Sequence, residues 1–384
     1  MSTVTETARV LVDNTKEKLG STVAEHKEPL KLSGVLDQYE SFDVTPVIGR
    51  EFPNAKLKEW LEAPNSDELI RDLAITSETT LNDNLPLSDK FLFTVSQRGV
   101  VFFRKQDDIT NDLQKQLVHR LGQLSWNSDN PKTSGLHIHP VSNSGRTLGG
   151  KDDEISVISS EQQKKLYANA PYKKKQSHAD GWHSDITFEP IPSDYALLRL
   201  TELPKTGGDT LWASGYEVYD RLSPPIQKLL ESLTGTYAQP IFEEAARSNG
   251  FELYSKPRGA PENVGTELKA THPIVRTNPV TAWKSIFSVG HHAKRINELT
   301  EEESETFLKW FVRLIVDNHD LQVRHRWQNP NDLAIWDNRS VYHTATYDYD
   351  GLGARTGQRA VSLGEKPFLD PQSTSRREAL SKEA

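Results

Sequence analysis

Apolar residues recur at helical spacing in two stretches of the chain. The first stretch predicts a helix over Ile109–Leu124. The second begins at Thr300, where Thr300 and Glu303 have the spacing of a capping box. It continues along one apolar face of an amphipathic helix, formed by Phe307, Leu308, Phe311, Leu314 and Ile315. Two amphipathic helices are therefore expected to pack on a larger apolar structure.

Short strand-like runs outnumber these helices, and clusters of Gly, Pro, Asn and Asp separate them. The predicted strands are Phe91–Val95, Val100–Phe103, Tyr195–Leu200, Thr210–Trp212, Ser285–Val289, Gln322–Trp327, Leu333–Trp336 and Arg359–Leu363. Many short strands with a few packed helices favour a mainly β fold with flanking helices, of the β-sandwich or jelly-roll type.

The chain of 384 residues shows no internal repeat and no long low-complexity linker. We expect a partly ordered N-terminal extension over residues 1–30, because this stretch is polar and weakly patterned. One domain is expected over residues 31–371, followed by a similar polar tail over residues 372–384. Residues 140–178 are expected to form a flexible cover beside the substrate region.

The amino-acid composition excludes or disfavours several classes of function. The 46 Lys and Arg against 54 Asp and Glu give a formal charge of −8, which disfavours a nucleic-acid partner. The sequence contains no cysteine, so disulfides, iron–sulfur clusters and thiol nucleophiles are excluded. It has neither a membrane-spanning apolar run nor a signal-peptide pattern, and we expect a cytoplasmic enzyme. The sequence leaves a homo-oligomer open.

Two histidines and one carboxylate have the composition of a metal site. His183 and Asp185 are two residues apart, so an extended strand would direct both side chains to one face. His343 follows Asp185 by 158 residues and would come from another strand. Two histidines and one carboxylate with open positions are the ligands of a non-haem Fe(II) oxygenase. Three structural polar residues are the alternative that spacing alone leaves open.

Four sequence blocks carry a resemblance to a known family. They occur in the family's order within about residues 90–370 and are Leu136–Pro140, Trp182–Phe188, Glu202–Trp212 and Asn331–Arg339. Together they resemble the taurine dioxygenase family of Fe(II)- and 2-oxoglutarate-dependent oxygenases. Two further stretches, Trp212–Glu217 and Gly290–His292, are similar to the fungal sulfonate dioxygenase branch.

The resemblance implies a double-stranded β-helix that uses Fe(II), the co-substrate 2-oxoglutarate and O2. It assigns His183, Asp185 and His343 as the metal ligands. It also implies that Thr210 and Arg355 bind 2-oxoglutarate, and arginine offers the two-pronged donor that a distal carboxylate needs.

The resemblance also implies a substrate site. Arg359 matches the arginine that holds the sulfonate in the taurine enzyme, and His139 matches a histidine that assists it. On an extended segment Arg355 and Arg359 would lie about 13 Å apart, which favours two separate anions. Ile186 and Phe188 are candidate apolar wall residues, and a core role is the alternative for both.

The chain departs from the taurine enzyme at two substrate positions. Ser142 stands in place of a tyrosine, and Ala179 stands in place of an asparagine. We therefore expect a small anionic substrate, foremost an alkylsulfonate that would yield sulfite, an aldehyde, succinate and CO2. A carboxylate or a secondary metabolite is the alternative substrate.

Two other classes of function compete with the oxygenase, namely a non-catalytic β-sandwich binding module and a zinc hydrolase. Lys173 to Lys175 are interpreted as a solvated loop, and Trp327 and Trp336 as core aromatics. His291 and His292 are expected in a structural role or near the pocket rim. A metal role for this pair is disfavoured, because neighbours on a strand point to opposite faces.

Overall fold

The structure, a computed structural model, describes residues 28–75, 95–125, 135–143, 150–166 and 179–383. Most of the expected N-terminal extension, the residues 91–94 of one predicted strand and the lysines 173–175 lie outside these ranges. The last residue of that predicted strand, Val95, begins the short helix α4 (Val95–Arg98), so a strand ending there is wrong.

The largest sheet has seven strands in the order β1-β2-β3-β13-β5-β15-β4. Neighbouring strands are antiparallel except for the parallel pair β2 and β3. The bounds are β1 Phe42–Asp43, β2 Arg50–Phe52, β3 Val100–Phe103, β13 Leu333–Asp337, β5 Ser193–Glu202, β15 Thr356–Leu363 and β4 Ser156–Ser159.

A second sheet of three strands has the order β12-β6-β14, with β12 Gln322–His325, β6 Thr210–Ser214 and β14 Val341–Ala345. A buried cluster joins the two sheets, and in it the rings of Trp212 and Trp336 lie 5.7 Å apart. Both indoles are almost fully buried, which agrees with the core role expected for Trp336. The interior between these two sheets is therefore an apolar core.

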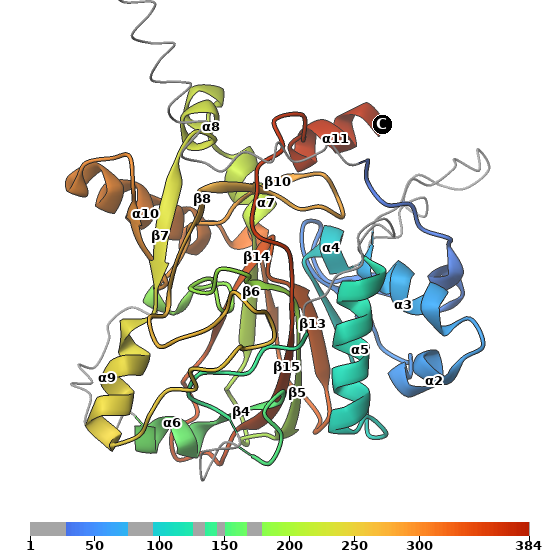
Figure 1. Cartoon of the computed structure of the whole chain (residues 1–384). Helices are drawn as coiled ribbons and strands as arrows, with labels where there is room; N and C mark the ends of the chain where they lie inside the picture. Colours follow the sequence, from blue (N-terminus) through green and yellow to red (C-terminus); the bar gives the residue numbers. More distant parts are fainter. Residues whose placement is uncertain (1–27, 76–94, 126–134, 144–149, 167–178, 384) are drawn as a thin grey trace, which may run out of the picture.

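Alternation along the central strands explains how the main sheet is covered on both faces. In β3, Val100 and Phe102 belong to the cluster between the sheets, whereas Val101 and Phe103 belong to a second cluster. That cluster includes residues of three helices that cover the outer face of the main sheet (Figure 1): α2 (Leu57–Glu62), α3 (Ser66–Ala74) and α5 (Asn111–Leu124). Strands buried on both faces read as continuous apolar runs, which is why the sequence revealed them.

A third cluster packs smaller sheets against helices beside the two main sheets (Figure 1). The sheets have the orders β11-β7-β8 and β10-β9. Their strands are β7 Thr234–Ala238, β8 Lys269–Pro273, β9 Val275–Thr277, β10 Lys284–Ile286 and β11 Ala293–Ile296. Helices α7 (Gly215–Asp220), α8 (Pro224–Leu230) and α10 (Glu301–Val316) contribute residues to this cluster. Two further helices are α6 (Ser160–Leu166) and α9 (Pro240–Asn249). Single-turn 3-10 helices lie at η1 Val35–Gln38, η3 Ala179–Gly181 and η4 His319–Leu321.

The two predicted helices are confirmed. Helix α5 begins after Thr110, whose side chain accepts a hydrogen bond from the Leu113 backbone N–H. Helix α10 begins after Thr300, and both hydrogen bonds of the capping box with Glu303 are present. Strand β3 has the predicted bounds, and apart from Phe91–Val95 the other predicted strands differ by a few residues at their ends.

Two of the polar segments contain regular structure among their described residues. The tail after residue 371 contains helix α11 (Arg376–Glu383), and Arg376 donates to Glu217 of α7 at 2.9 Å. Within the expected cover, β4 is the edge strand of the main sheet and pairs with β15. Strand β4 and helix α11 each contact a partner far away in sequence, which their local composition cannot reveal. Among the described helices, none has the length and apolar content needed to cross a membrane.

Candidate active site

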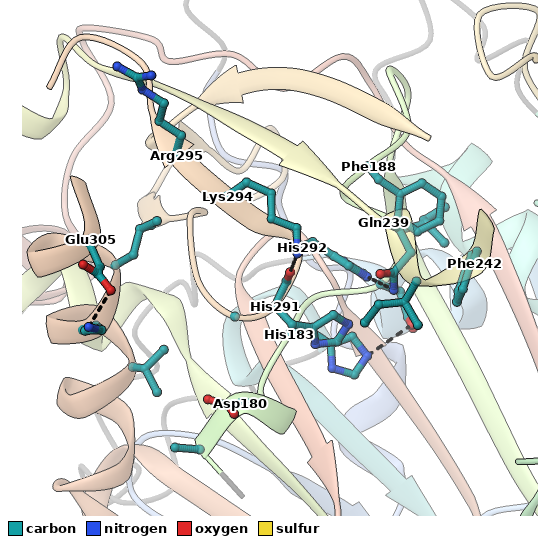
Figure 2. Close-up of a pocket in the computed structure, with 18 of the residues that line it drawn as sticks. Asp180, His183, Phe188, Gln239, Phe242, His291, His292, Lys294, Arg295 and Glu305 are labelled. Atoms are coloured by element: carbon teal, nitrogen blue, oxygen red, sulfur yellow. Dashed lines mark hydrogen bonds and ion pairs between the residues drawn. The ribbon is translucent and has the colours of Figure 1, made fainter. Parts of the chain in front are cut away.

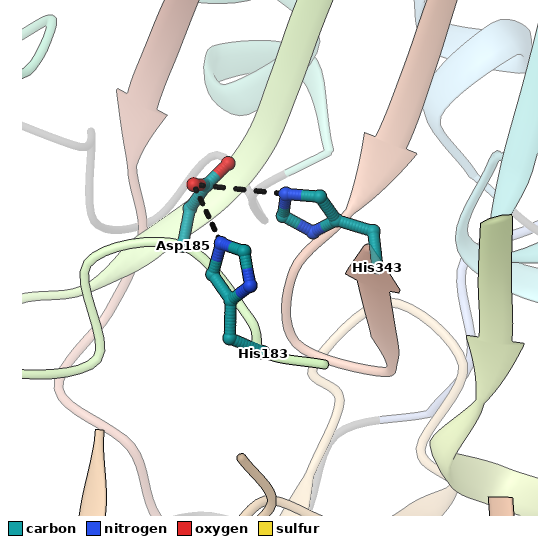
Figure 3. Close-up of side chains that lie close together, drawn as sticks. All are labelled: His183, Asp185 and His343. Atoms are coloured by element: carbon teal, nitrogen blue, oxygen red, sulfur yellow. Dashed lines mark ion pairs between the residues drawn. The ribbon is translucent and has the colours of Figure 1, made fainter. Parts of the chain in front are cut away.

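The three expected ligands lie together (Figure 3). Asp185 Oδ1 is 4.0 Å from His183 Nε2 and 3.9 Å from His343 Nε2. The three ligand atoms all lie within 4.8 Å of one another, close enough to serve one ion. In the part of the chain that the structure describes, this is the single group of histidine and acidic residues with that property.

Backbone pairing brings the two histidines together. His183 N–H donates to the His343 carbonyl at 3.1 Å, and His343 N–H donates to the His183 carbonyl at 2.8 Å. The extended strand expected to carry both His183 and Asp185 is wrong, however, because the chain enters a turn after this isolated bridge. Ile186 in that turn has φ +48°, a strained conformation for a β-branched residue that costs roughly 1–3 kcal/mol. Asp185 therefore reaches the histidines from a strained turn.

Gly290 allows a second segment to approach the metal ligands. Its backbone pairs with His183 in another isolated bridge, and its φ is +90°. A Cβ atom at this position would lie 1.8 Å from the Trp182 carbonyl oxygen and 3.0 Å from the Cα of His183. Only glycine permits this approach.

The donor atoms of the three residues fit a divalent metal. His183 Nδ1 lies 2.8 Å from the Gly181 carbonyl. Since a carbonyl can only accept, Nδ1 carries the proton and Nε2 keeps its lone pair for a metal. Asp185 Oδ2 and His343 Nδ1 are buried and have no hydrogen-bond partner among the described residues.

The charges of these groups are also those of metal ligands. Burial and the neighbouring His183 lower the pKa of His343 to about 3, so its ring is neutral near pH 7. Burial alone would raise the pKa of Asp185, but the charge of Arg359 and the nearby imidazoles outweigh it and lower that pKa. The centre thus presents two neutral imidazoles and one carboxylate, the set that suits iron with open positions.

The expected substrate residues lie next to the ligands. Arg359 Nη1 donates to Asp185 Oδ1 at 2.5 Å; the Asp185 side chain is buried, and that of Arg359 is 12% exposed. His139 Nδ1 accepts from the backbone N–H groups of Val141 at 3.1 Å and Ser142 at 2.9 Å. Its proton therefore lies on Nε2, and burial followed by the charge of Arg359 lowers its pKa well below 6.5. His139 is thus a neutral hydrogen-bond donor.

The expected 2-oxoglutarate residues contact each other. Arg355 Nη2 donates to Thr210 Oγ1 at 3.2 Å, and its Nε donates to the Gly208 carbonyl at 2.8 Å. On strand β6, Trp212 pairs with His343 of β14, and Thr210 is two residues farther along. The side chains of Thr210 and His343 therefore face the same interior, about 7 Å apart along the strands.

Arg355 lacks an internal counter-charge. Among the described residues, no carboxylate lies within 4.0 Å of its guanidinium group, although the side chain is buried. Arg355 and Arg359 thus have different partners, as two separate anion sites require.

Two of the triad residues, His183 and Asp185, line a cleft of 1490 Å³. The expected substrate residues that line it are His139, Ile186, Phe188 and Arg359. In Figure 2, Phe188, Gln239 and Phe242 lie on one side of the histidines and Glu305 of α10 lies on the other. Thr210 and Arg355 are not among its lining residues. Ala179, at one of the departures from the taurine enzyme, does line the cleft.

His291 and His292 also line this cleft. The strand argument for them is wrong, because both belong to a turn and both rings approach His183, at 4.7 and 5.7 Å. His292 is held by Thr187 Oγ1 at 3.0 Å and by the Gln239 amide at 3.1 Å. Gln239 escaped the sequence reasoning, since it belongs to none of the recognised blocks.

Comparisons with known proteins find relatives among 2-oxoglutarate-dependent dioxygenases. The family described as "Taurine catabolism dioxygenase TauD, TfdA family" matches residues 41–361. The alpha-ketoglutarate-dependent dioxygenase btcD of Neocamarosporium betae is 52% identical over 363 residues, covering 92% of this chain and 98% of its own. The alpha-ketoglutarate-dependent sulfonate dioxygenase of Saccharomyces cerevisiae is 29% identical over 350 residues, covering 89% and 77%. The crystal structure of a taurine dioxygenase from Burkholderia xenovorans has a TM-score of 0.60 at 21% identity, covering 87% and 94%.

The fold and the triad define an Fe(II)-dependent oxygenase that takes 2-oxoglutarate and O2. The chain belongs to the TauD, TfdA dioxygenase family.

Proposed function

We propose that the two main sheets form a double-stranded β-helix in which the enzyme hydroxylates a small organic anion, foremost an alkylsulfonate. His183, Asp185 and His343 would hold Fe(II), which supplies activation of O2 when bound. Arg355 and Thr210 would hold the distal carboxylate of 2-oxoglutarate. One oxygen atom of O2 enters succinate as 2-oxoglutarate loses CO2, and the other becomes the hydroxyl group of the product.

The protein's residues orient the substrate for this reaction. Arg359 would bind its anionic group, and His139 would donate a second hydrogen bond from Nε2. Ile186 and Phe188 would exclude water around the reacting carbon. If that carbon carries the sulfonate, the hydroxylated product expels sulfite and becomes an aldehyde.

The observation that carries the proposal is the contact of Arg359 with Asp185 beside His139. It puts a partly buried cation and a neutral donor at the triad, on residues that line the cleft. Because Asp185 already pairs with Arg359, an anion seated there would bind through the remaining N–H groups of the guanidinium and lie next to the metal.

A carboxylate or a secondary metabolite is the second candidate substrate. The cleft volume of 1490 Å³ exceeds the roughly 300–1,000 Å³ of most small-molecule pockets, which suits a body larger than taurine. Ala179 gives the cleft a methyl group where the taurine enzyme has an amide. The name of btcD, which is 52% identical to this chain, mentions no sulfonate. The relative named as a sulfonate dioxygenase is 29% identical.

A panel of sulfonates, carboxylates and neutral analogues tests these candidates. Succinate would be measured for every compound, with sulfite measured for the sulfonates. We expect the alkylsulfonates to stimulate succinate formation and release sulfite. Stimulation by carboxylates alone would overturn the sulfonate assignment and favour the second candidate.

The variant R359Q tests the anion site. We expect it to keep the slow turnover of 2-oxoglutarate without substrate, but to lose roughly 10- to 100-fold in stimulation by acids, because a charge-assisted hydrogen bond contributes about 1.5–3 kcal/mol. R295Q alters an arginine of the same cleft and serves as the matched control. Equal stimulation by the acids in wild type and R359Q would refute the anion site. The cytoplasmic location, the homo-oligomer and the single-domain division stay predictions.

A further inference from the structure

The buried side-chain amide of Asn338 lies beside the triad and has no part in the reaction proposed above. Asn338 follows strand β13 and its side chain is almost fully buried. Its Oδ1 accepts two hydrogen bonds, from the Asp185 backbone N–H and the Trp336 indole N–H, both at 3.0 Å. Its Nδ2 donates to Ser193 Oγ at 2.9 Å. With both ends of the amide engaged, its orientation is determined.

The first of these bonds supports the strained turn. Asp185 leaves the His183 bridge and enters the turn in which Ile186 has φ +48°. Its backbone N–H is buried, and Asn338 Oδ1 is its partner. Without that acceptor the N–H group would be orphaned inside the protein, which favours a different turn conformation.

The second bond reaches the other side of the triad. Trp336 and Asn338 are two residues apart, so both face the interior between the sheets. The Trp336 ring lies 5.0 Å from the His343 ring at an interplanar angle of 53°. Because the indole N–H is held by Asn338, the ring against which His343 packs is held as well.

We propose that Asn338 is a positioning residue of the metal centre, linking the backbone of Asp185 to the packing surface of His343. Asp185 lies 153 residues from Asn338 in sequence, and this tertiary contact brings the two together. Asn338 thereby sets the separation of Asp185 from His343. The inference rests on the metal role of the triad and is independent of the substrate.

The test is a metal titration of the purified chain without substrate or 2-oxoglutarate. Co(II) would be titrated into wild type, N338A and the control N278A, with its absorption spectrum recorded. Asn278 is an equally buried asparagine that bonds Asp337 and Tyr216, away from the ligands. Circular dichroism would establish that each protein is folded at the titration temperature.

We expect N338A to weaken Co(II) binding by roughly 10-fold or more, with a shifted spectrum, while N278A changes it less than about twofold. Equal affinities and spectra in N338A and N278A would overturn the inference and leave the triad assignment intact. Failure of wild type to bind Co(II) would instead overturn the metal role itself.

W336F keeps the inference testable if N338A does not fold. It removes the donor to Asn338 together with part of the buried indole, and it retains a ring beside His343. A shifted Co(II) spectrum with about threefold weaker binding supports the positioning role, and an unchanged spectrum and affinity contradict it.

Discussion

Replacement of Arg355 by methionine removes the cation proposed to hold 2-oxoglutarate while keeping much of the side-chain volume. The guanidinium group donates to the Gly208 carbonyl and to Thr210 Oγ1, which leaves its other N–H groups for a carboxylate. Two charge-assisted hydrogen bonds of about 1.5–3 kcal/mol each amount to roughly 3–6 kcal/mol. We therefore expect kcat/KM for 2-oxoglutarate to fall roughly 10²- to 10⁴-fold in R355M.

The same substitution should not destabilise the protein without its co-substrate. Arg355 is a buried cation with no carboxylate within 4.0 Å among the described residues, so its removal relieves a desolvation cost. With Mn(II) and 2-oxoglutarate at about 100 times its Kd, wild type should gain about 2.7 kcal/mol of unfolding free energy, and R355M should gain none.

The assays are succinate formation over a range of 2-oxoglutarate concentrations and thermal unfolding with and without the co-substrate. R199M is a matched control, because Arg199 is also largely buried and bonds only the side-chain amides of Asn111, Gln114 and Asn331. An unchanged kcat/KM together with a retained thermal shift in R355M would refute the assignment of Arg355.

Three further predictions concern the scaffold. G290A should lose about 2–5 kcal/mol of unfolding free energy in urea, because its Cβ would meet the Trp182 carbonyl at 1.8 Å and φ is +90°; a loss below 1 kcal/mol, roughly the cost of an ordinary substitution, would contradict this. His325 has a pKa lowered to about 3 by burial and then by Arg104, so below pH 6.5 the unfolded chain binds a proton that the folded chain excludes. Stability should fall as pH drops from about 6.5 towards 3, and H325F should flatten that slope by up to about 1.4 kcal/mol per pH unit; equal slopes would refute the assignment. T300A should cost about 1 kcal/mol through the lost cap of α10 with no change in turnover, and calorimetry would check it.

The sequence by itself determined the elements whose signals are local. The capping box at Thr300 needs only neighbouring residues, and the apolar run Val100–Phe103 is readable because both faces of that strand are buried. The identities of the metal ligands came from the composition of His183, Asp185 and His343 and from the family resemblance. None of this required knowledge of how distant segments meet.

Local patterns failed where distant contacts decide the conformation. The stretch Trp182–Phe188 looks like a strand, yet it turns after His183, and the Asp185 N–H finds its acceptor on Asn338. The C-terminal residues look like a loose tail, yet α11 is joined to α7 by Arg376 and Glu217.

Only the tertiary structure showed which charges face one another. Spacing along an extended chain separates Arg355 from Arg359, but it cannot show that Arg359 reaches Asp185 or that Arg355 reaches Thr210. Burial then gives these contacts their effect, since it lowers the pKa of His343 to about 3 and also lowers the pKa of Arg355, which has no carboxylate within 4.0 Å among the described residues. Sequence therefore determined the ligand chemistry, and the packing of segments far apart in the chain decided its geometry and protonation.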